Sequence, residues 1–181
     1  MKQFFATLIL ILSINSSIAQ DSAVKLGVSG LTHGHVGWIL SRDSQTDIKM
    51  VGIVEPNKQL AQRLSNEFGF SMDIVFDTMD EMIKKVKPDA VAAFGNIKEH
   101  LNVVESCAPK GIHVMVEKPL ATNLEDAKKI EALAKKYKIH VLTNYETSWY
   151  ETNVKANDLL EKGTIGDLRK VIIRDGHKGP K

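Results

Sequence analysis

The sequence has a single cysteine, Cys107, so it can form no internal disulfide bond. It also lacks a basic stripe interleaved with aromatic residues, and its formal net charge is only +2, which argues against a nucleic-acid partner. No apolar run reaches the roughly 20 residues that a helix needs to cross a bilayer. Internal repeats and low-complexity linkers are absent as well. With 43% hydrophobic and 25% charged residues, the composition is that of one globular domain with a real core.

The N-terminus has the pattern of a secretory signal peptide. Met1 and Lys2 give a positive start, residues 4–14 form an apolar run, and Ser17 and Ala19 supply small residues at a cleavage site. We therefore expect cleavage after Ala19 and export to the periplasm or the medium, with no membrane association afterwards. A membrane anchor is the alternative, but the apolar run is too short to span a bilayer.

Beyond the signal, short apolar runs alternate with amphipathic helical patterns. Strands are expected at residues 24–28, 50–54, 74–76, 90–94, 112–116 and 139–143. Helices are expected at residues 35–42, 58–68, 79–86, 98–108 and 124–137. This alternation indicates an α/β fold, a doubly wound parallel sheet with both faces covered.

The character of the sequence changes near residue 148. A helix is expected at residues 153–162 and a short strand at residues 168–174. We therefore divide the chain into a signal peptide (1–19), a dinucleotide-binding domain (20–147) and the start of a second, α+β domain (148–181).

The turn after the first strand carries glycines and histidines. In a doubly wound sheet, glycines at this turn let backbone N–H groups approach a pyrophosphate. Aligned with G-x-G-x-x-G, Gly30 takes the first position, but Thr32 and His35 stand at the second and third. Gly34 lies beside the gap and can do part of the work. By itself the stretch fits a plain strand-to-helix turn equally well.

The second strand ends at Glu55, 25 residues after Gly30. An acid at this position can accept hydrogen bonds from the ribose hydroxyls of a dinucleotide, and it repels a 2′-phosphate. Glu55 therefore favours NAD over NADP, although Lys58 lies close enough in sequence to weaken that preference. The alternative is a solvated acid at the end of a strand.

Glu117 and Lys118 follow the strand at residues 112–116, at the edge where open α/β sheets bind ligands. Pro119 restricts the backbone of Lys118, and Thr122 and Glu125 have the spacing of a capping box for the next helix. An ammonium group held there can hydrogen-bond a substrate hydroxyl or carbonyl and act as acid or base. The alternative is an ordinary surface Glu-Lys pair.

Most of the mature sequence resembles the Gfo/Idh/MocA oxidoreductases, the family of glucose–fructose oxidoreductase and inositol dehydrogenase. The resemblance is carried by KPDAVAAFGNIKEHLNVVESCAPKGIHVMVEKP, HVMVEKPLATNLEDAKKIEALAKKYKIHVLTNYE, VGIVEPN and EKGTIGDLRKVIIRDGHKGP. It implies a Rossmann domain that binds NAD or NADP and a reaction at a sugar, cyclitol or related polyol carbon. It also implies a homo-oligomer for the full-length protein.

The resemblance implies Lys118 as the catalytic residue, near the nicotinamide and the reacting carbon. It implies a set of cofactor-binding residues, with Gly30, Thr32, His33, Gly34 and His35 at the pyrophosphate turn, Glu55 at the adenosine ribose, and Asn96, His100 and Glu117 toward the nicotinamide.

The sequence departs from the family pattern at three places. Thr32 replaces the middle glycine, where a side chain would crowd the pyrophosphate, and residues 94–95 are Phe-Gly where Thr-Pro is common. The sequence also stops as the second domain begins, and family members draw substrate contacts from that domain. One interpretation is therefore an exported oxidoreductase of which this is the cofactor-binding portion. The alternative is a non-catalytic dinucleotide- or sugar-binding module, or a truncated remnant that binds another protein.

Other candidate sites carry less chemistry. His33 and His35 have a spacing that suits a metal ion, but the sequence shows no third ligand, so we expect phosphate contacts rather than a metal site. Cys107 is expected to be a small core residue before it is a nucleophile. Tyr145 and Tyr150 have no lysine four residues later, so the Tyr-x-x-x-Lys pair of short-chain dehydrogenases is absent.

Overall fold

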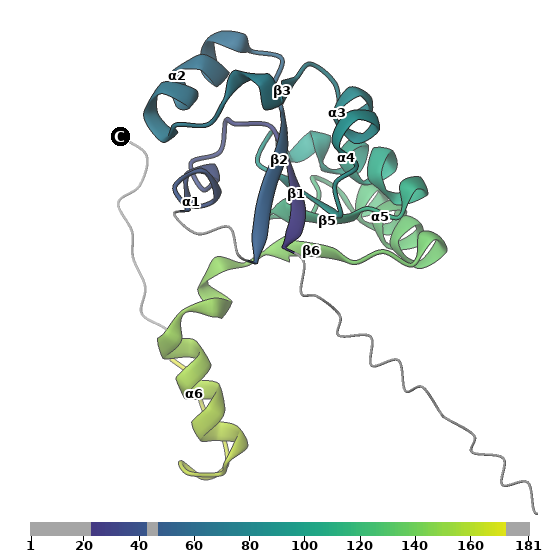
Figure 1. Cartoon of the computed structure of the whole chain (residues 1–181). Helices are drawn as coiled ribbons and strands as arrows, with labels where there is room; N and C mark the ends of the chain where they lie inside the picture. The colour runs from purple at the N-terminus through teal and green to yellow at the C-terminus, as the bar shows by residue number, and fades with distance from the viewer. Residues whose placement is uncertain (1–22, 43–46, 173–181) are drawn as a thin grey trace, which may run out of the picture.

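The computed structural model describes residues 23–42 and 47–172, which form a parallel β-sheet with helices on both faces (Figure 1). Its strands are β1 Val24–Ser29, β2 Ile48–Val54, β3 Val75–Phe76, β4 Ala90–Ala93, β5 His113–Glu117 and β6 Val141–Asn144. The predicted doubly wound α/β fold is confirmed. The predicted signal peptide, residues 1–19, lies outside the described residues.

The strand order is β3-β2-β1-β4-β5-β6, and every neighbouring pair is parallel. The chain moves outward from β1 through β2 to β3 and then returns to the other side of β1 as β4. Ser29, the last residue of β1, therefore pairs with Ala93, the last residue of β4. In open α/β sheets, ligands bind in the crevice where the strand order reverses in this way.

Each face of the sheet has its own apolar core. Helices α1 Val36–Leu40 and α2 Lys58–Phe68 cover one face, and α3 Met79–Val86, α4 His100–Cys107 and α5 Leu124–Tyr137 cover the other (Figure 1). Strand β4 serves both faces, because successive side chains of a strand point to opposite sides. Val91 belongs to the core beneath α3 to α5, and Ala92 belongs to the core beneath α1 and α2.

Cys107 lies in α4 and is fully buried. Burial raises the pKa of its thiol to about 12, an effect that nearby Lys110 opposes only in part. The thiol is therefore protonated at neutral pH and is no nucleophile. The predicted core role of Cys107 is confirmed.

Helix α5 has the predicted bounds, 124–137, but its capping residue differs from the prediction. Asn123, not Thr122, is the capping residue: its Oδ1 accepts a hydrogen bond from the backbone N–H of Asp126 at 2.8 Å. Its Nδ2 also donates to Asp126 Oδ2 at 2.7 Å, so the two side chains secure the first turn together. The predicted capping box of Thr122 and Glu125 is wrong, because Asn is at least as good a cap as Thr and stands one residue nearer the helix.

The last helix, α6 Glu151–Glu161, stands away from the sheet and its two helical layers (Figure 1). It follows the short 3-10 helix η4 Glu146–Trp149 and has no buried residue. The strand predicted at residues 168–174 is wrong where it can be checked, since residues 168–172 have no regular structure. Residues 173 and 174 lie outside the described residues. No helix in the described part of the chain is long and apolar enough to cross a membrane.

Candidate functional site

The turn between β1 and α1 comes very close to the loop that follows β4. Gly30 has a φ of +78°, and a Cβ placed on it would lie 2.6 Å from the Cα of Gly95. No L-residue with a side chain fits such a position without displacing the backbone. Gly30, the predicted first glycine of the motif, thus packs directly against Gly95, which is one of the departures from the family pattern.

Hydrogen bonds fix this turn and leave two of its donors available. The carbonyl of Phe94 accepts from the backbone N–H of His33 at 2.9 Å and from the hydroxyl of Thr32 at 3.4 Å. Within residues 23–42 and 47–172, nothing accepts a hydrogen bond from the backbone N–H of Thr32 or Gly34. Unused backbone donors in a glycine-containing turn suit an anionic group such as a phosphate.

Glu55 anchors the turn through hydrogen bonds to backbone N–H groups. Its carboxylate is 5% exposed, and its two oxygens accept from the backbone N–H groups of Leu31 at 3.0 Å and Asn57 at 2.9 Å. A carboxylate has about four acceptor positions, so two remain for ribose hydroxyls. The nearby Lys58 is paired with Asp77, with Nζ 2.6 Å from Oδ1.

A cleft of about 480 Å³ opens at the carboxyl ends of β1 and β4, within the roughly 300–1,000 Å³ typical of ligand sites. Its lining residues are Ser29, Gly30, Thr32, Val54, Glu55, Pro56, Gly95, Asn96 and Glu99. The structure thereby brings together four of the predicted cofactor residues, Gly30, Thr32, Glu55 and Asn96. The side chain of Asn96 also accepts from the backbone N–H of Lys98 at 3.0 Å, which orients its amide.

Lys118 follows β5, and its side chain is exposed. The Lys118–Pro119 peptide bond is cis. Its ammonium group has no hydrogen-bond or ion-pair partner in the described part of the chain, so it is available to an external acceptor. Lys118 does not line the cleft.

His100 contacts the loop that carries Lys118. Its side chain is buried, with Nδ1 3.1 Å from the carbonyl oxygen of Leu120. Burial lowers the pKa of His100, against the opposing influence of the Leu120 and Pro119 carbonyls, so the imidazole is neutral at neutral pH. His100 therefore holds the loop in place, and its direct contact with a cofactor stays a prediction.

Glu117 joins three elements at the end of β5. It is 1% exposed, and its Oε1 accepts from Asn144 Nδ2 at 2.7 Å and lies 3.0 Å from His35 Nδ1. Burial acts to raise the pKa of Glu117, but the hydrogen bonds from Asn144 and His35 and the charges of His35 and His33 outweigh it, so the pKa lies below its usual value. The carboxylate is therefore ionised at neutral pH.

The structure supplies the third group that the two histidines lacked in sequence. One ligand atom each of His33, His35 and Glu117 lie within 4.8 Å of one another. The sequence shows no third ligand for the two histidines, and Glu117 is the candidate that the structure adds. A second missed residue is Glu146, whose Oε2 lies 3.3 Å from His35 Nε2. Neither contact has a local sequence signal, because His35 and Glu117 are 82 residues apart.

Known proteins with similar sequences include several dehydrogenases and oxidoreductases. Residues 22–145 match the family model GFO_IDH_MocA, described as an oxidoreductase family with an NAD-binding Rossmann fold. The chain is 26% identical over 156 residues to myo-inositol 2-dehydrogenase of Thermotoga maritima, which covers 84% of this chain and 46% of that enzyme. It is 23% identical over 131 residues to D-glucoside 3-dehydrogenase of Escherichia coli, with coverages of 72% and 37%.

The fold is also that of solved structures. Scyllo-inositol dehydrogenase from Lactobacillus casei, crystallised with NAD(H) and scyllo-inositol, superposes with a TM-score of 0.67 at 23% identity, over 80% of this chain and 43% of that one. The chain spans less than half the length of each of these relatives. The family match covers more than half of this chain, and the observed strand order is that of a Rossmann fold. The chain therefore belongs to the Gfo/Idh/MocA family of oxidoreductases, and residues 22–145 are its NAD-binding Rossmann domain.

Proposed function

We propose that the chain binds NAD in the cleft at the carboxyl ends of β1 and β4, and that it forms the cofactor-binding portion of an oxidoreductase acting on a sugar, cyclitol or related polyol. The glycine turn carries this proposal, because Thr32, whose backbone N–H is unused, lines a cleft of suitable size, and Gly34, with a second unused N–H, lies two residues further along the same turn. The polyol class is supported by relatives that are inositol and glucoside dehydrogenases.

The charges around the cleft favour NAD over NADP. Two carboxylates, Glu55 and Glu99, line it, and both would repel the 2′-phosphate of NADP. Lys58, the cation that could have offset them, is already paired with Asp77. The side chain of Thr32 fits within this arrangement because its hydroxyl is hydrogen-bonded to the carbonyl of Phe94.

The residues at the end of β5 would handle the proton of the reaction. A bound nicotinamide supplies the hydride acceptor or donor. Lys118 Nζ would hydrogen-bond the substrate oxygen: as the neutral amine it would take up the proton that the hydroxyl loses on oxidation, and as the ammonium it would return a proton to the carbonyl oxygen on reduction. Glu117, at the end of β5, stays ionised and holds Asn144 at the end of β6 and His35 at the start of α1 in position.

Calorimetric titration of NAD and NADP into the whole chain tests the proposal. We expect saturable binding of NAD and weaker binding of NADP. Glu99→Gln should reduce the preference for NAD over NADP about fivefold. This factor corresponds to the repulsion of about 1 kcal/mol between two unit charges about 4 Å apart in water, which the variant removes. Lys118→Ala should leave NAD affinity unchanged, because the lysine serves the reaction. A folded protein that binds neither nucleotide would contradict the proposal.

Turnover separates an enzyme from a binding module. We expect production of NADH, followed by its absorbance, when a panel of inositols and sugars is added with NAD to a protein that also contains the rest of the family's second domain. The same panel with Lys118→Ala should give no signal. NAD binding without turnover on any of these substrates would favour the non-catalytic module.

We further propose that the protein works outside the cytoplasm, which is supported by the signal-peptide pattern of residues 1–19. Dinucleotides are scarce there, so the nicotinamide should be held tightly and reduced and reoxidised in place. Prolonged dialysis of the purified protein should leave the nucleotide bound. Free release of the nucleotide on dialysis would count against this proposal.

A further inference from the structure

We propose that His33, His35 and Glu117 form a binding site for a divalent transition metal of the zinc class. One ligand atom of each residue lies within 4.8 Å of the others, and two imidazoles with one carboxylate are a ligand set that zinc accepts. None of the three lines the cleft between β1 and β4, but His33 and His35 flank Gly34 in the turn that borders it. The inference does not depend on the function proposed above.

The geometry of the cluster is close to that of a coordination sphere. Ligand atoms about 2.1 Å from a tetrahedral zinc ion lie about 3.4 Å from one another. His35 Nδ1 and Glu117 Oε1 are already 3.0 Å apart, so a metal ion needs them to separate only slightly. The remaining separations are at most 4.8 Å, and His33, which is only partly buried, can close them by a side-chain rotation that gives up the hydrogen bond from the His35 N–H to its Nδ1.

The surrounding residues orient the ligands as metal sites usually require. A metal-binding histidine generally donates its other ring N–H to a carboxylate, and the ligating carboxylate is itself hydrogen-bonded. His35 Nε2 lies 3.3 Å from Glu146 Oε2, within ion-pair reach although not in hydrogen-bond geometry, and Asn144 donates to Glu117 at 2.7 Å. The ring of His35 also stacks on Trp38, with centroids 4.0 Å apart, which fixes its plane.

Glu117 provides an independent indication of a cation. Its Oε2 is buried and has no hydrogen-bond partner among the described residues, although buried polar atoms are almost always paired. Its side chain is 2% exposed, so solvent does not compensate its charge. His35 keeps 23% of its side chain exposed, which leaves a path for an ion to enter.

Three protein ligands leave a fourth tetrahedral position, which water or an oxygen of a bound ligand would take. Calorimetric titration of Zn²⁺ and visible absorption of Co²⁺, both with the whole chain, test the site. We expect one saturable site per chain and the absorption of tetrahedral Co²⁺. His33→Ala and His35→Ala should each weaken Zn²⁺ binding at least about 100-fold, and Glu146→Gln roughly 10- to 100-fold.

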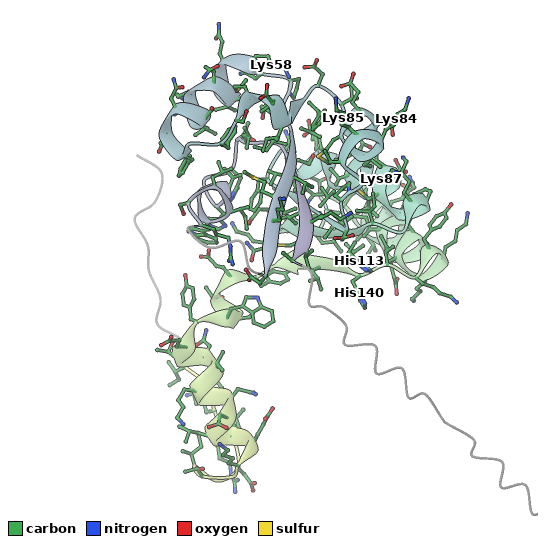
Figure 2. All side chains as sticks on the ribbon, in the orientation of Figure 1. Lys58, Lys84, Lys85, Lys87, His113 and His140 are labelled. Atoms are coloured by element: carbon green, nitrogen blue, oxygen red, sulfur yellow. The ribbon has the colours of Figure 1, made fainter. Side chains whose placement is uncertain are left out.

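Surface histidines provide the matched control. His113 and His140 form an exposed pair with ring centroids 5.0 Å apart (Figure 2), and a His113→Ala/His140→Ala protein should bind Zn²⁺ as the wild type does. Glu117→Gln keeps the shape of the side chain, so a loss of Zn²⁺ affinity there cannot come from misfolding if its circular dichroism matches the wild type. Unchanged Zn²⁺ affinity in His33→Ala, or loss of the site in the His113→Ala/His140→Ala protein, would overturn the proposal.

Discussion

At the scale of single residues, Gly30 and Gly34 occupy the same turn under opposite constraints. Gly30 has a positive φ and touches the backbone of Gly95, whereas a Cβ on Gly34 would meet no atom within 4 Å. We expect Gly30→Ala to lower the free energy of unfolding by at least about 1–2 kcal/mol, the cost of a left-handed residue with a side chain, and to abolish NAD binding. Gly34→Ala should stay within about 0.5 kcal/mol of the wild type.

Urea unfolding of the two variants measures this difference. Equal stability of the Gly30→Ala and Gly34→Ala proteins would mean that the close approach to Gly95 does not restrict the turn.

His100 makes the stability of the protein depend on pH. Its pKa lies below the ordinary value of 6.5 in the folded protein because burial disfavours the imidazolium. Between the lowered pKa and 6.5, the unfolded chain binds a proton that the folded chain does not. Stability from this residue is therefore complete above 6.5 and is lost as the pH falls below it, by at most about 1.4 kcal/mol per pH unit.

The measurement is the free energy of unfolding of the wild type and of His100→Gln from about pH 7.5 to about pH 5, the range in which histidine titrates. The wild type should lose more stability on acidification than the variant. The exposed His113 gives the control, since His113→Gln should follow the wild type. Parallel curves for the wild type and His100→Gln would contradict the assignment.

At the scale of elements, the start of α5 depends on one side chain. Asn123 accepts from the Asp126 N–H, and Thr122 makes no comparable bond to the helix. Asn123→Ala should therefore cost about 1 kcal/mol of stability, within the usual 0.5–2 kcal/mol for a lost cap. Thr122→Ala should change stability by less than about 0.5 kcal/mol. Urea unfolding of both variants decides between the two caps, and a larger loss for Thr122→Ala would show that the helix begins one residue earlier.

Helices whose ends carry strong local signals were predicted to the residue. Asn57 caps the start of α2 and Gly69 closes its end in the left-handed conformation, and α2 has the predicted bounds 58–68. Where two good caps stand side by side, as at Thr122 and Asn123, local preference does not choose between them. The strand predicted at residues 168–174 is absent over the described residues 168–172, because an apolar run marks a strand only where a neighbouring strand pairs with it.

The residues of the candidate site likewise fall into those that the sequence predicts and those that only the structure reveals. The positions of Gly30, Glu55 and Lys118 at strand ends follow from the order of elements, because ligand sites of parallel sheets gather at that edge. The contact of His35 with Glu117 and Glu146 depends on how the turn after β1 meets the ends of β5 and β6. Such contacts between distant segments have no periodicity or spacing in the sequence, so only the structure reveals them.

At the scale of the whole molecule, the sheet and its two helical layers are separate from α6. The two apolar cores are built from β1 to β6 and α1 to α5, and α6 contributes no buried residue. Several apolar side chains in this segment are exposed, among them Trp149, which is 77% exposed, Val154 and Ile165. The layers therefore provide the stability of the fold, and the segment after η4 adds surface without adding to either core.

A chain that ends at Tyr150 should accordingly keep the stability of the whole chain. It retains Glu146 and the Tyr150 hydroxyl that donates to it, and it loses only α6 and the residues beyond. We expect a free energy of unfolding within about 0.5 kcal/mol of the whole chain and the same NAD affinity, since surface changes seldom exceed that size. A chain that ends at Lys138 also lacks β6, which pairs with β5 and supplies Asn144, and it should lose cooperative unfolding. Urea unfolding of the three chains measures both effects, and a marked loss of stability in the chain ending at Tyr150 would move the boundary of the domain beyond η4.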